Sequence, residues 1–415
     1  MNLKNLIISA FALAAIAFSM SATHYVGGDI SLLPDYEKSK AQYKDFGGKR
    51  IADLLPWLHE QGMNAMRVRL FNDPSKYTGD DKNNVVQDLA YIRPLCKQIV
   101  EDGFDLMLDF HYSDYWADPA KQTTPDAWKN LDDATLCDSV YAFTRHTLEV
   151  LKADAAAPKF IQPGNEISYG LLWGPEGTSD KNKKKVYMNN PANWERFGNL
   201  LKAAVKACRE VCPDAQIVIH TERVAKLDVQ RYFYNQMAKL GVDYDIIGIS
   251  YYPYFHGGLN VLDAALADLS KNFDKQIMLV ETGYPYAWEV PGTTHDNTAA
   301  WPYTLAGQEK FAKDVVATLD KYPKADGLFW WWMEYNAKGT SLSGWYNAPL
   351  FDSRDGKATP ALKAICSYAT SGVENIVDDS QEISGDNKWY DISGREVKEP
   401  LNRGIYIRNG KKIIR

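Results

Sequence analysis

Residues 276–285 are QIMLVETGYP, an apolar run that ends in a glutamate, Glu281, and then in turn-forming residues. A short β-rich run bounded by turn residues is typical of a buried strand in a parallel sheet. Seven similar runs alternate with longer stretches along most of the chain. The expected strands are 24–31, 64–71, 105–112, 160–167, 216–222, 245–253, 276–285 and 326–333. Eight strands with helices between them predict an α/β fold, a (β/α)8 TIM barrel.

The stretches between these strands have the spacing of amphipathic helices. They are expected at 86–102, 134–152, 194–211, 228–240, 260–273, 305–321 and 360–369. An open doubly wound sheet would give a similar alternation, but it usually carries a glycine-rich phosphate-binding loop. The sequence contains no such loop, which favours the closed barrel.

Polar and aromatic side chains gather where the expected strands end. These groups are 72–73, 111–116, 165–166, 220–223, 251–256, 281–286 and 330–335. Active sites of barrel enzymes are built from the C-terminal ends of the strands and the loops that follow them. The pattern therefore predicts one site at that end of the barrel.

Composition excludes several classes of protein. The chain has 415 residues, with 47 basic and 53 acidic side chains and a net charge of −6, so no nucleic-acid partner is expected. The 12 Trp, 25 Tyr and 15 Phe can pack a core, and some of them can offer flat faces to sugars. The five cysteines include Cys208 and Cys212, one helical turn apart, which favours free buried thiols over disulfides. The cysteine and histidine spacing gives no metal motif.

The N-terminus resembles an export signal. Residues 1–22 combine Lys4 with an apolar run from Leu6 to Met20, as a secretory signal peptide does. The run is short for a membrane span, so the mature chain is expected to have no transmembrane segment. We therefore expect an exported protein, periplasmic, cell-surface or extracellular. We also expect the protein to be a monomer.

The C-terminus changes composition after the barrel domain, which we place at 23–370. Residues 371–387 are polar and acidic and are expected to form a linker. Residues 388–415 alternate apolar and polar side chains around the turn signals Ser393-Gly394 and Asn409-Gly410, which predicts a short C-terminal β-hairpin-like tail. The alternative for this basic tail is a sorting or surface-attachment element.

Strand-end carboxyls indicate the chemistry. Cleavage of a glycosidic bond needs one carboxyl that protonates the departing oxygen and a second that attacks the anomeric carbon or activates water. The candidates are Glu166, Glu222, Glu281 and Glu334. Glu166 follows an asparagine, and Glu281 follows a long apolar strand where a carboxylate is costly without a task or a partner. This pattern favours the pair Glu166 and Glu281.

The strand expected at 64–71 supplies a partner for one of these carboxyls. Arg67 and Arg69 alternate to the same face, so both point into the barrel or both point out of it. An inward arginine would keep a neighbouring glutamate ionised and its pKa low.

Several motifs resemble the endo-β-1,4-galactanases of glycoside hydrolase family 53. The resemblance covers roughly residues 24–370 in order, and residues 109–119, DFHYSDYWADP, are its most specific block. The motifs are Gly62-Met63-Asn64, Arg67-x-Arg69, Asn72-Asp73-Pro74, 109–119, 164–167, His220-Thr221, 250–253, 281–285 and 327–331. The tail from residue 388 is similar, more weakly, to secretion or attachment tails of Bacteroidetes proteins.

The resemblance implies a retaining hydrolase of β-1,4-galactan, arabinogalactan or galactooligosaccharides. Glu166 would be the acid/base and Glu281 the nucleophile. Asn165 would bind the sugar 2-hydroxyl, and Arg69 (or Arg67) with Tyr252 would hold the nucleophile. The cleft would be lined by His111, Asp114, Trp116, His220 and Trp331. Sugar stacking is expected of Trp116, Trp173 and residues 330–332.

The resemblance also bears on cofactors. No cofactor is expected for the chemistry. Bacterial relatives can carry calcium after strand 7, and His295-Asp296-Asn297 keep part of that pattern, but Thr293 stands where an acid is expected. This departure weighs against a structural calcium.

Two other functions remain open. A related endo-glycosidase acting on mannan, xylan or glucan would share the two glutamates and differ in the 109–119 block. A non-catalytic glycan-binding barrel would be expected to have lost one of the two carboxylates, and both are present.

Overall fold

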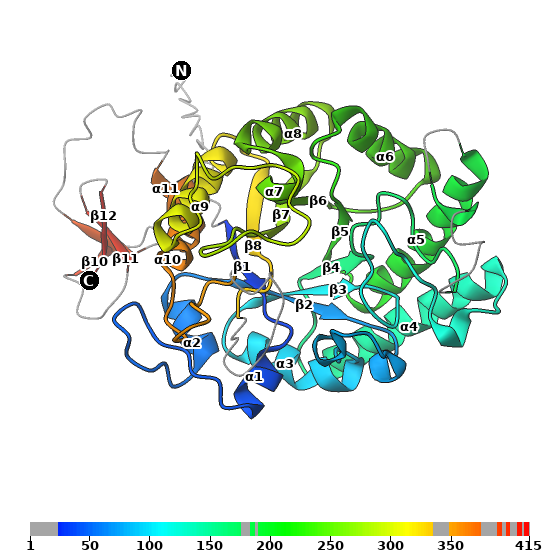
Figure 1. The fold of residues 1–415 in the computed structure, drawn as a ribbon, viewed down its shortest axis with the longest axis horizontal. Helices are drawn as coiled ribbons and strands as arrows, with labels where there is room; N and C mark the ends of the chain where they lie inside the picture. The colour runs from blue at the N-terminus through cyan, green and yellow to red at the C-terminus, as the bar shows by residue number, and fades with distance from the viewer. Residues whose placement is uncertain are drawn as a thin grey trace, which may run out of the picture. The chain divides into compact units, whose positions relative to one another are not determined.

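Eight parallel strands close into a barrel in consecutive order, β1 to β8 (Figure 1). The structure is a computed structural model that describes residues 24–175, 183–186, 190–334, 348–374, 388–391, 396–398, 405–408 and 411–414. The barrel strands are β1 (Tyr25–Asp29), β2 (Ala65–Leu70), β3 (Asp105–Phe110), β4 (Phe160–Pro163), β5 (Gln216–Thr221), β6 (Ile246–Tyr251), β7 (Gln276–Thr282) and β8 (Ala325–Trp330). The predicted (β/α)8 barrel is confirmed, and β8 pairs with β1 to close it.

Helices follow the strands and surround the barrel. They are α1 (Leu33–Lys38), α2 (Leu54–Glu60), α3 (Leu89–Glu101), α4 (Asp133–Ala153), α5 (Pro191–Val211), α6 (Leu227–Leu240), α7 (Pro253–His256), α8 (Leu259–Asn272), α9 (Leu305–Leu319), α10 (Pro360–Cys366) and α11 (Tyr368–Glu374). The seven predicted helices are confirmed within a few residues. The short helices α1, α2 and α7 were not predicted, because pieces of four to seven residues are too short to show a helical period. None of the described helices is both long and apolar enough to cross a bilayer.

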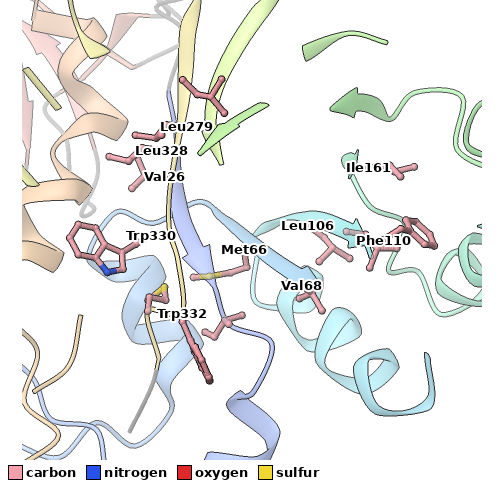
Figure 2. Packing of buried hydrophobic residues seen from close by; sticks show 14 of the residues in the cluster. Val26, Met66, Val68, Leu106, Phe110, Ile161, Leu279, Leu328, Trp330 and Trp332 are labelled. Atoms are coloured by element: carbon pink, nitrogen blue, oxygen red, sulfur yellow. The ribbon is translucent and has the colours of Figure 1, made fainter. Parts of the chain in front are cut away.

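The barrel has an inner and an outer core. The inner core consists of side chains from the strands: Ala65, Met107, Phe160, Val218, Ile246, Met278, Val280 and Phe329. The outer core fills the space between strands and helices, and Figure 2 shows part of it, from Val26 on β1 to Leu328 on β8. A Cβ on Gly27 would lie 1.7 Å from the carbonyl oxygen of Ala65, so only glycine allows β1 to approach β2 here.

The chain divides into two compact units. One is the barrel, His24–Glu374, and the other contains the C-terminal segment. In that segment β9 (Trp389–Asp391), β10 (Glu396–Val397), β11 (Ile405–Arg408) and β12 (Lys411–Ile414) form an antiparallel sheet in the order β10-β9-β11-β12. The predicted β-rich tail is thus a sheet of four short strands. Helix α11 continues past the predicted domain end at 370, and residues 1–22 and most of 371–387 lie outside the described residues.

The cysteines follow the sequence prediction. All five are free, and Cys96, Cys208, Cys212 and Cys366 are buried, while Cys137 is half-buried. Burial raises the pKa of the Cys366 thiol to about 12, so this thiol stays protonated and unreactive. The barrel core therefore holds without disulfides, as its size allows.

Candidate active site

A cleft of about 500 Å³ opens at the C-terminal end of the strands. The residues that line it come from the segments after β2, β3, β4, β5, β6 and β8 and from the end of β7. They include His111, Trp116, Asn165, Glu166, Glu222, Tyr252, Glu281 and Trp331. This volume is in the range of small-molecule sites, and the cleft lies at the end of the barrel where the sequence predicted a site.

A strained turn brings Glu166 into the cleft. Gly164 has φ of +103°, and a Cβ there would lie 2.6 Å from Cγ2 of Ile167, so the turn requires glycine. Glu166 itself has φ of +48°, in the left-handed region that side chains rarely adopt. Such backbone strain concentrates at functional sites.

Irregular pairing brings Glu281 into the same cleft. Met278 and Val280 face the inner core, so strict alternation would turn Glu281 outward. The register between β6 and β7 shifts between Ile249 and Ser250, and Ser250 pairs with Glu281. A second shift lies between β7 and β8 after Leu279. Bulges of this kind re-aim side chains near active sites, and here Glu281 lines the cleft.

Two residues hold the Glu281 carboxylate. Arg67 Nη2 lies 2.9 Å from Oε1, and the Tyr252 hydroxyl donates a hydrogen bond to Oε2 at 3.0 Å. Arg67 also pairs with Asp109 at 2.8 Å and lies 3.6 Å from Asp29. The predicted contact of an inward arginine with the nucleophile candidate is therefore made by Arg67.

Arg69 has a different role from Arg67. Its guanidinium pairs with Asp29 and lies over the rings of Trp116 and Trp332, with Cζ 4.7 and 5.3 Å from the ring centroids. The indole nitrogen of Trp116 donates to Asp81 Oδ2 at 2.8 Å. Arg69 therefore supports the aromatic wall of the cleft and does not contact Glu281 by any described hydrogen bond or ion pair.

One hydroxyl connects the two glutamates. Ser250 Oγ lies 3.5 Å from Glu281 Oε2, and the same side chain lowers the pKa of the Glu166 carboxyl against the larger effect of burial. Two carboxyls that reach a single hydroxyl lie close together. Glycosidases likewise hold two carboxyls on either side of the bond that they cleave.

His220 orients that hydroxyl. The backbone N–H of Glu166 donates to His220 Nδ1 at 3.3 Å, so Nδ1 accepts and Nε2 carries the proton. Nε2 then donates to Ser250 Oγ at 2.8 Å, which leaves the hydroxyl proton for the carboxyls. Burial, helped by Arg67, lowers the pKa of His220 well below its usual value, so the ring is neutral. His220 lies beneath the cleft and is not among the residues that line it.

Burial dominates the titration of both glutamates. It raises the pKa of Glu166 well above its usual range, and the charges of Glu281 and Glu222 raise it further. Burial also raises the pKa of Glu281, but there Arg67 opposes the rise. The prediction of a low pKa for Glu281 was therefore wrong, because burial outweighs the arginine. Glu281 still loses its proton before Glu166, so at intermediate pH the pair holds one proton on Glu166.

The other predicted cleft residues divide into two groups. His111, Trp116, Asn165 and Trp331 line the cleft. Asp114 does not line it, because its carboxylate accepts from the backbone N–H groups of Asp73 and Asp126 and joins two loops.

Two of the tryptophans expected to stack on sugars belong to the core. Trp173 and Trp330 are fully buried, and their indole N–H groups donate to the carbonyls of Tyr169 and Ala348. Position in the sequence next to a site is thus a weak guide to the orientation of an aromatic ring.

Four buried polar residues beneath the cleft were not predicted from the sequence. They are Asp29, Asp109, Gln162 and Ser250. Asp109 accepts from Arg67, and although burial works against its charged form, Arg67 and His111 hold its pKa below the usual value. The alternation of side chains along a β-strand could have identified Asp109 from the sequence. Asp109 lies two residues before His111, so the two side chains point to the same face.

The segment 295–297 does not fit a calcium site. Asp296 Oδ1 accepts from the backbone and hydroxyl of Thr298, and the Asn297 amide donates to the carbonyls of Pro253 and His295. Within the described ranges no three acidic, histidine or cysteine side chains gather as metal ligands.

Glu334, a rejected catalytic candidate, makes a testable contribution to stability. It is fully buried, its Oε1 accepts from the backbone N–H of Leu32 at 2.9 Å, and burial together with Asp29 raises its pKa to about 8. A carboxyl with a raised folded-state pKa favours folding when protonated, so stability falls as pH rises from the unfolded value toward 8. Glu334→Gln is expected to remove this decline, which is up to about 1.4 kcal/mol per pH unit for one proton.

Urea denaturation between pH 5 and 9 measures this difference. The parent should lose unfolding free energy toward pH 8 more steeply than the variant. Parallel curves for the two proteins would show that Glu334 does not titrate in this window.

Comparisons with known proteins place the chain among relatives. The family model described as glycosyl hydrolase family 53 matches residues 25–365, which include both glutamates. A protein of Aspergillus niger named arabinogalactan endo-beta-1,4-galactanase A is 30% identical over 350 residues, 81% of this chain and 93% of that protein. The solved GH53 catalytic domain of Ignisphaera aggregans is 33% identical with a TM-score of 0.72, covering 83% of this chain and 95% of that chain. A structure of fungal beta-1,4-galactanases is 27% identical with a TM-score of 0.69, covering 83% and 99%.

Proposed function

The chain belongs to glycosyl hydrolase family 53, and on that premise we propose that it is a retaining endo-β-1,4-galactanase with Glu166 as acid/base and Glu281 as nucleophile. Its substrates are β-1,4-galactan, the galactan of arabinogalactan, and galactooligosaccharides. The observation that carries the assignment of roles is the pair of buried carboxyls, each influenced by Ser250, with the charge of Glu281 acting on Glu166. Among the residues that the structure describes, only Glu281 of the two contacts a cation, and this asymmetry separates acid from nucleophile.

In the first step Glu281 attacks the anomeric carbon. One oxygen of its carboxylate forms the bond to carbon while the glycosidic bond breaks, and the proton on Glu166 goes to the departing oxygen. Arg67 and Tyr252 keep the carboxylate in place, and the protonated state of Glu166 follows from its raised pKa. The products are a covalent glycosyl-enzyme and the released chain end.

In the second step water replaces Glu281. Glu166, now ionised, takes a proton from the water as its oxygen attacks the anomeric carbon, and the ester bond to Glu281 breaks. Asn165 donates one amide hydrogen to the Ala117 carbonyl and accepts from Arg67. Its second amide hydrogen can donate to the oxygen of the sugar 2-hydroxyl and so orient the ring for attack.

Hydrolysis of purified polysaccharides tests the function. The protein is expected to release galactooligosaccharides from β-1,4-galactan, with products of retained anomeric configuration by proton NMR. Faster release from mannan, xylan or glucan would favour a related endo-glycosidase. Binding of galactan without any release would favour a non-catalytic glycan-binding barrel.

Glu166→Gln separates the acid from the nucleophile. The variant is expected to lose about 10²–10⁴-fold in kcat/KM on galactan, because the departing sugar oxygen needs a proton. It should lose much less on a dinitrophenyl β-galactobioside, whose leaving group needs none. The parent's activity on galactan should fall as pH rises through the raised pKa of Glu166, and the variant should lack this alkaline decline. An equal loss on both substrates would contradict the acid role.

We also propose export and a monomeric state. The signal-like composition of residues 1–22 supports export to the periplasm, the cell surface or the medium. N-terminal sequencing of the mature protein and light scattering test these two proposals.

A further inference from the structure

Glu222 is a buried glutamate at the cleft that the proposed mechanism does not use. It comes directly after β5, two residues beyond the inward-facing His220, so alternation turns it into the barrel mouth. Its residue exposure is 8%, and it lines the cleft together with Glu166, Phe255 and His256. A carboxylate so placed is costly unless its oxygens have partners.

Only one of its two oxygens is satisfied. Oε1 accepts from the Ser168 hydroxyl at 2.6 Å and lies 2.9 Å from Arg223 Nε. Among the described residues no group donates to Oε2. Oε2 is itself buried beside the cleft; burial raises the pKa of Glu222 while Arg223 opposes the rise, and an ionised carboxylate offers about four acceptor positions, so Oε2 retains acceptor capacity there.

The surroundings hold this carboxylate in one orientation. Arg223 Nε also donates to Ser168 Oγ at 3.3 Å, and its guanidinium stacks on Tyr169 with Cζ 4.2 Å from the ring centroid. The acceptor is therefore preorganised, which is how binding sites reduce the entropy lost on binding.

The position of Glu222 identifies the part of the substrate that it faces. Glu281 is tied through Arg67 to Asn165, in the half of the cleft where the retained sugar must lie. Glu222 lies after β5, next to β4, and its charge acts on Glu166, the group that protonates the departing oxygen. The sugar that leaves with that oxygen therefore lies in the half of the cleft lined by Glu222, Phe255 and His256.

We propose that Oε2 of Glu222 accepts a hydrogen bond from a hydroxyl of the leaving sugar and so makes this half of the cleft a subsite for a sugar rather than for water. This inference rests on the proposed function. In the second step of the mechanism the same subsite receives an acceptor sugar. Glu222 thus sets how often the glycosyl-enzyme transfers to a second sugar instead of being hydrolysed.

The partition of the glycosyl-enzyme measures this role. The donor is 4-nitrophenyl β-galactobioside and the acceptor is galactobiose, and the readout is the ratio of transfer product to hydrolysis product. Glu166 activates both water and the acceptor, so a change in its basicity cancels in the ratio. Glu222→Gln is expected to lower the ratio about tenfold, the effect of one charge-assisted hydrogen bond.

A second variant and a control keep the test informative. Glu222→Asp retains the charge but withdraws the oxygens by one methylene, and it should lower the ratio to a similar extent. Glu149→Gln, the same change at an exposed glutamate on α4, should leave the ratio unchanged. The thermal melting temperature of each variant shows that it is folded.

The possible failures can be told apart. If the parent does not hydrolyse the donor, the proposed function fails and the inference fails with it. If the parent turns over and both Glu222 variants keep its ratio, the inference alone is overturned. The inference is also overturned if a Glu222 variant loses as much kcat/KM on the aryl donor as it loses in the ratio of transfer to hydrolysis product. Glu222 would then act on the retained half of the substrate or on the fold.

Discussion

Glu281→Gln is expected to lower kcat/KM on β-1,4-galactan by about 10⁴-fold or more, because the bond to the anomeric carbon cannot form without the carboxylate. The fold should survive the change. A glutamine oxygen can still accept from Arg67, and its amide can donate to the Tyr252 hydroxyl, which both donates and accepts. Arg67 also keeps its ion pair with Asp109.

Reducing-sugar release measures the turnover of the variant, and calorimetry measures its affinity for a galactooligosaccharide. The variant should bind the oligosaccharide about as tightly as the parent while releasing almost no sugar. Glu149→Gln, on the exposed face of α4, is the matched control and should retain parental turnover. Hydrolysis at the parental rate by Glu281→Gln would show that the roles of the glutamates are assigned wrongly.

Arg67→Met is expected to lower the free energy of unfolding by about 3–5 kcal/mol, because it leaves buried carboxylates without their cation. The side chain of Arg67 is 1% exposed and lies within ion-pair distance of Asp29, Asp109 and Glu281. Methionine is similar in length, so the lost charge, not an added cavity, dominates the effect. Activity should fall as well, since Glu281 loses a partner that keeps it ionised and in place.

Urea denaturation followed by tryptophan fluorescence measures this loss. Arg93→Met is the matched control: Arg93 is an exposed arginine paired with Asp154, and such a surface pair contributes about 0–1 kcal/mol. The pKa of Asp109 is lowered in the folded protein, so its contribution is present at neutral pH and is lost as pH falls through that value. The difference between parent and Arg67→Met should therefore shrink in acid, and a constant difference would contradict the ion-pair explanation.

Local pattern was enough to predict most of the fold. Each barrel strand is a short apolar run between turn residues, and each long helix shows a period near 3.6, so the eight strands and seven helices were predicted within a few residues. The short helices α1 and α2 were missed because their stability comes from packing against the barrel rather than from a periodic sequence.

Side-chain partners beneath the site were harder to predict. The sequence placed Arg67 and Arg69 on one face, but it could not show which of them reaches Glu281. Nor could it show that Asp114 joins two loops or that Trp173 is buried in the core. These facts depend on distances between segments far apart in the chain.

The sequence by itself determined the order of strands and helices and the end of the barrel that carries the site, and its motifs singled out the two glutamates that we propose as catalytic. Only the tertiary structure decided that Glu281 faces the cleft, because strict alternation after Met278 and Val280 would have turned it outward. The shifts in register between β6, β7 and β8 reverse that orientation. Alternation is a property of one strand, whereas a bulge is defined by how a strand pairs with its neighbours, and that pairing is fixed only when the barrel closes.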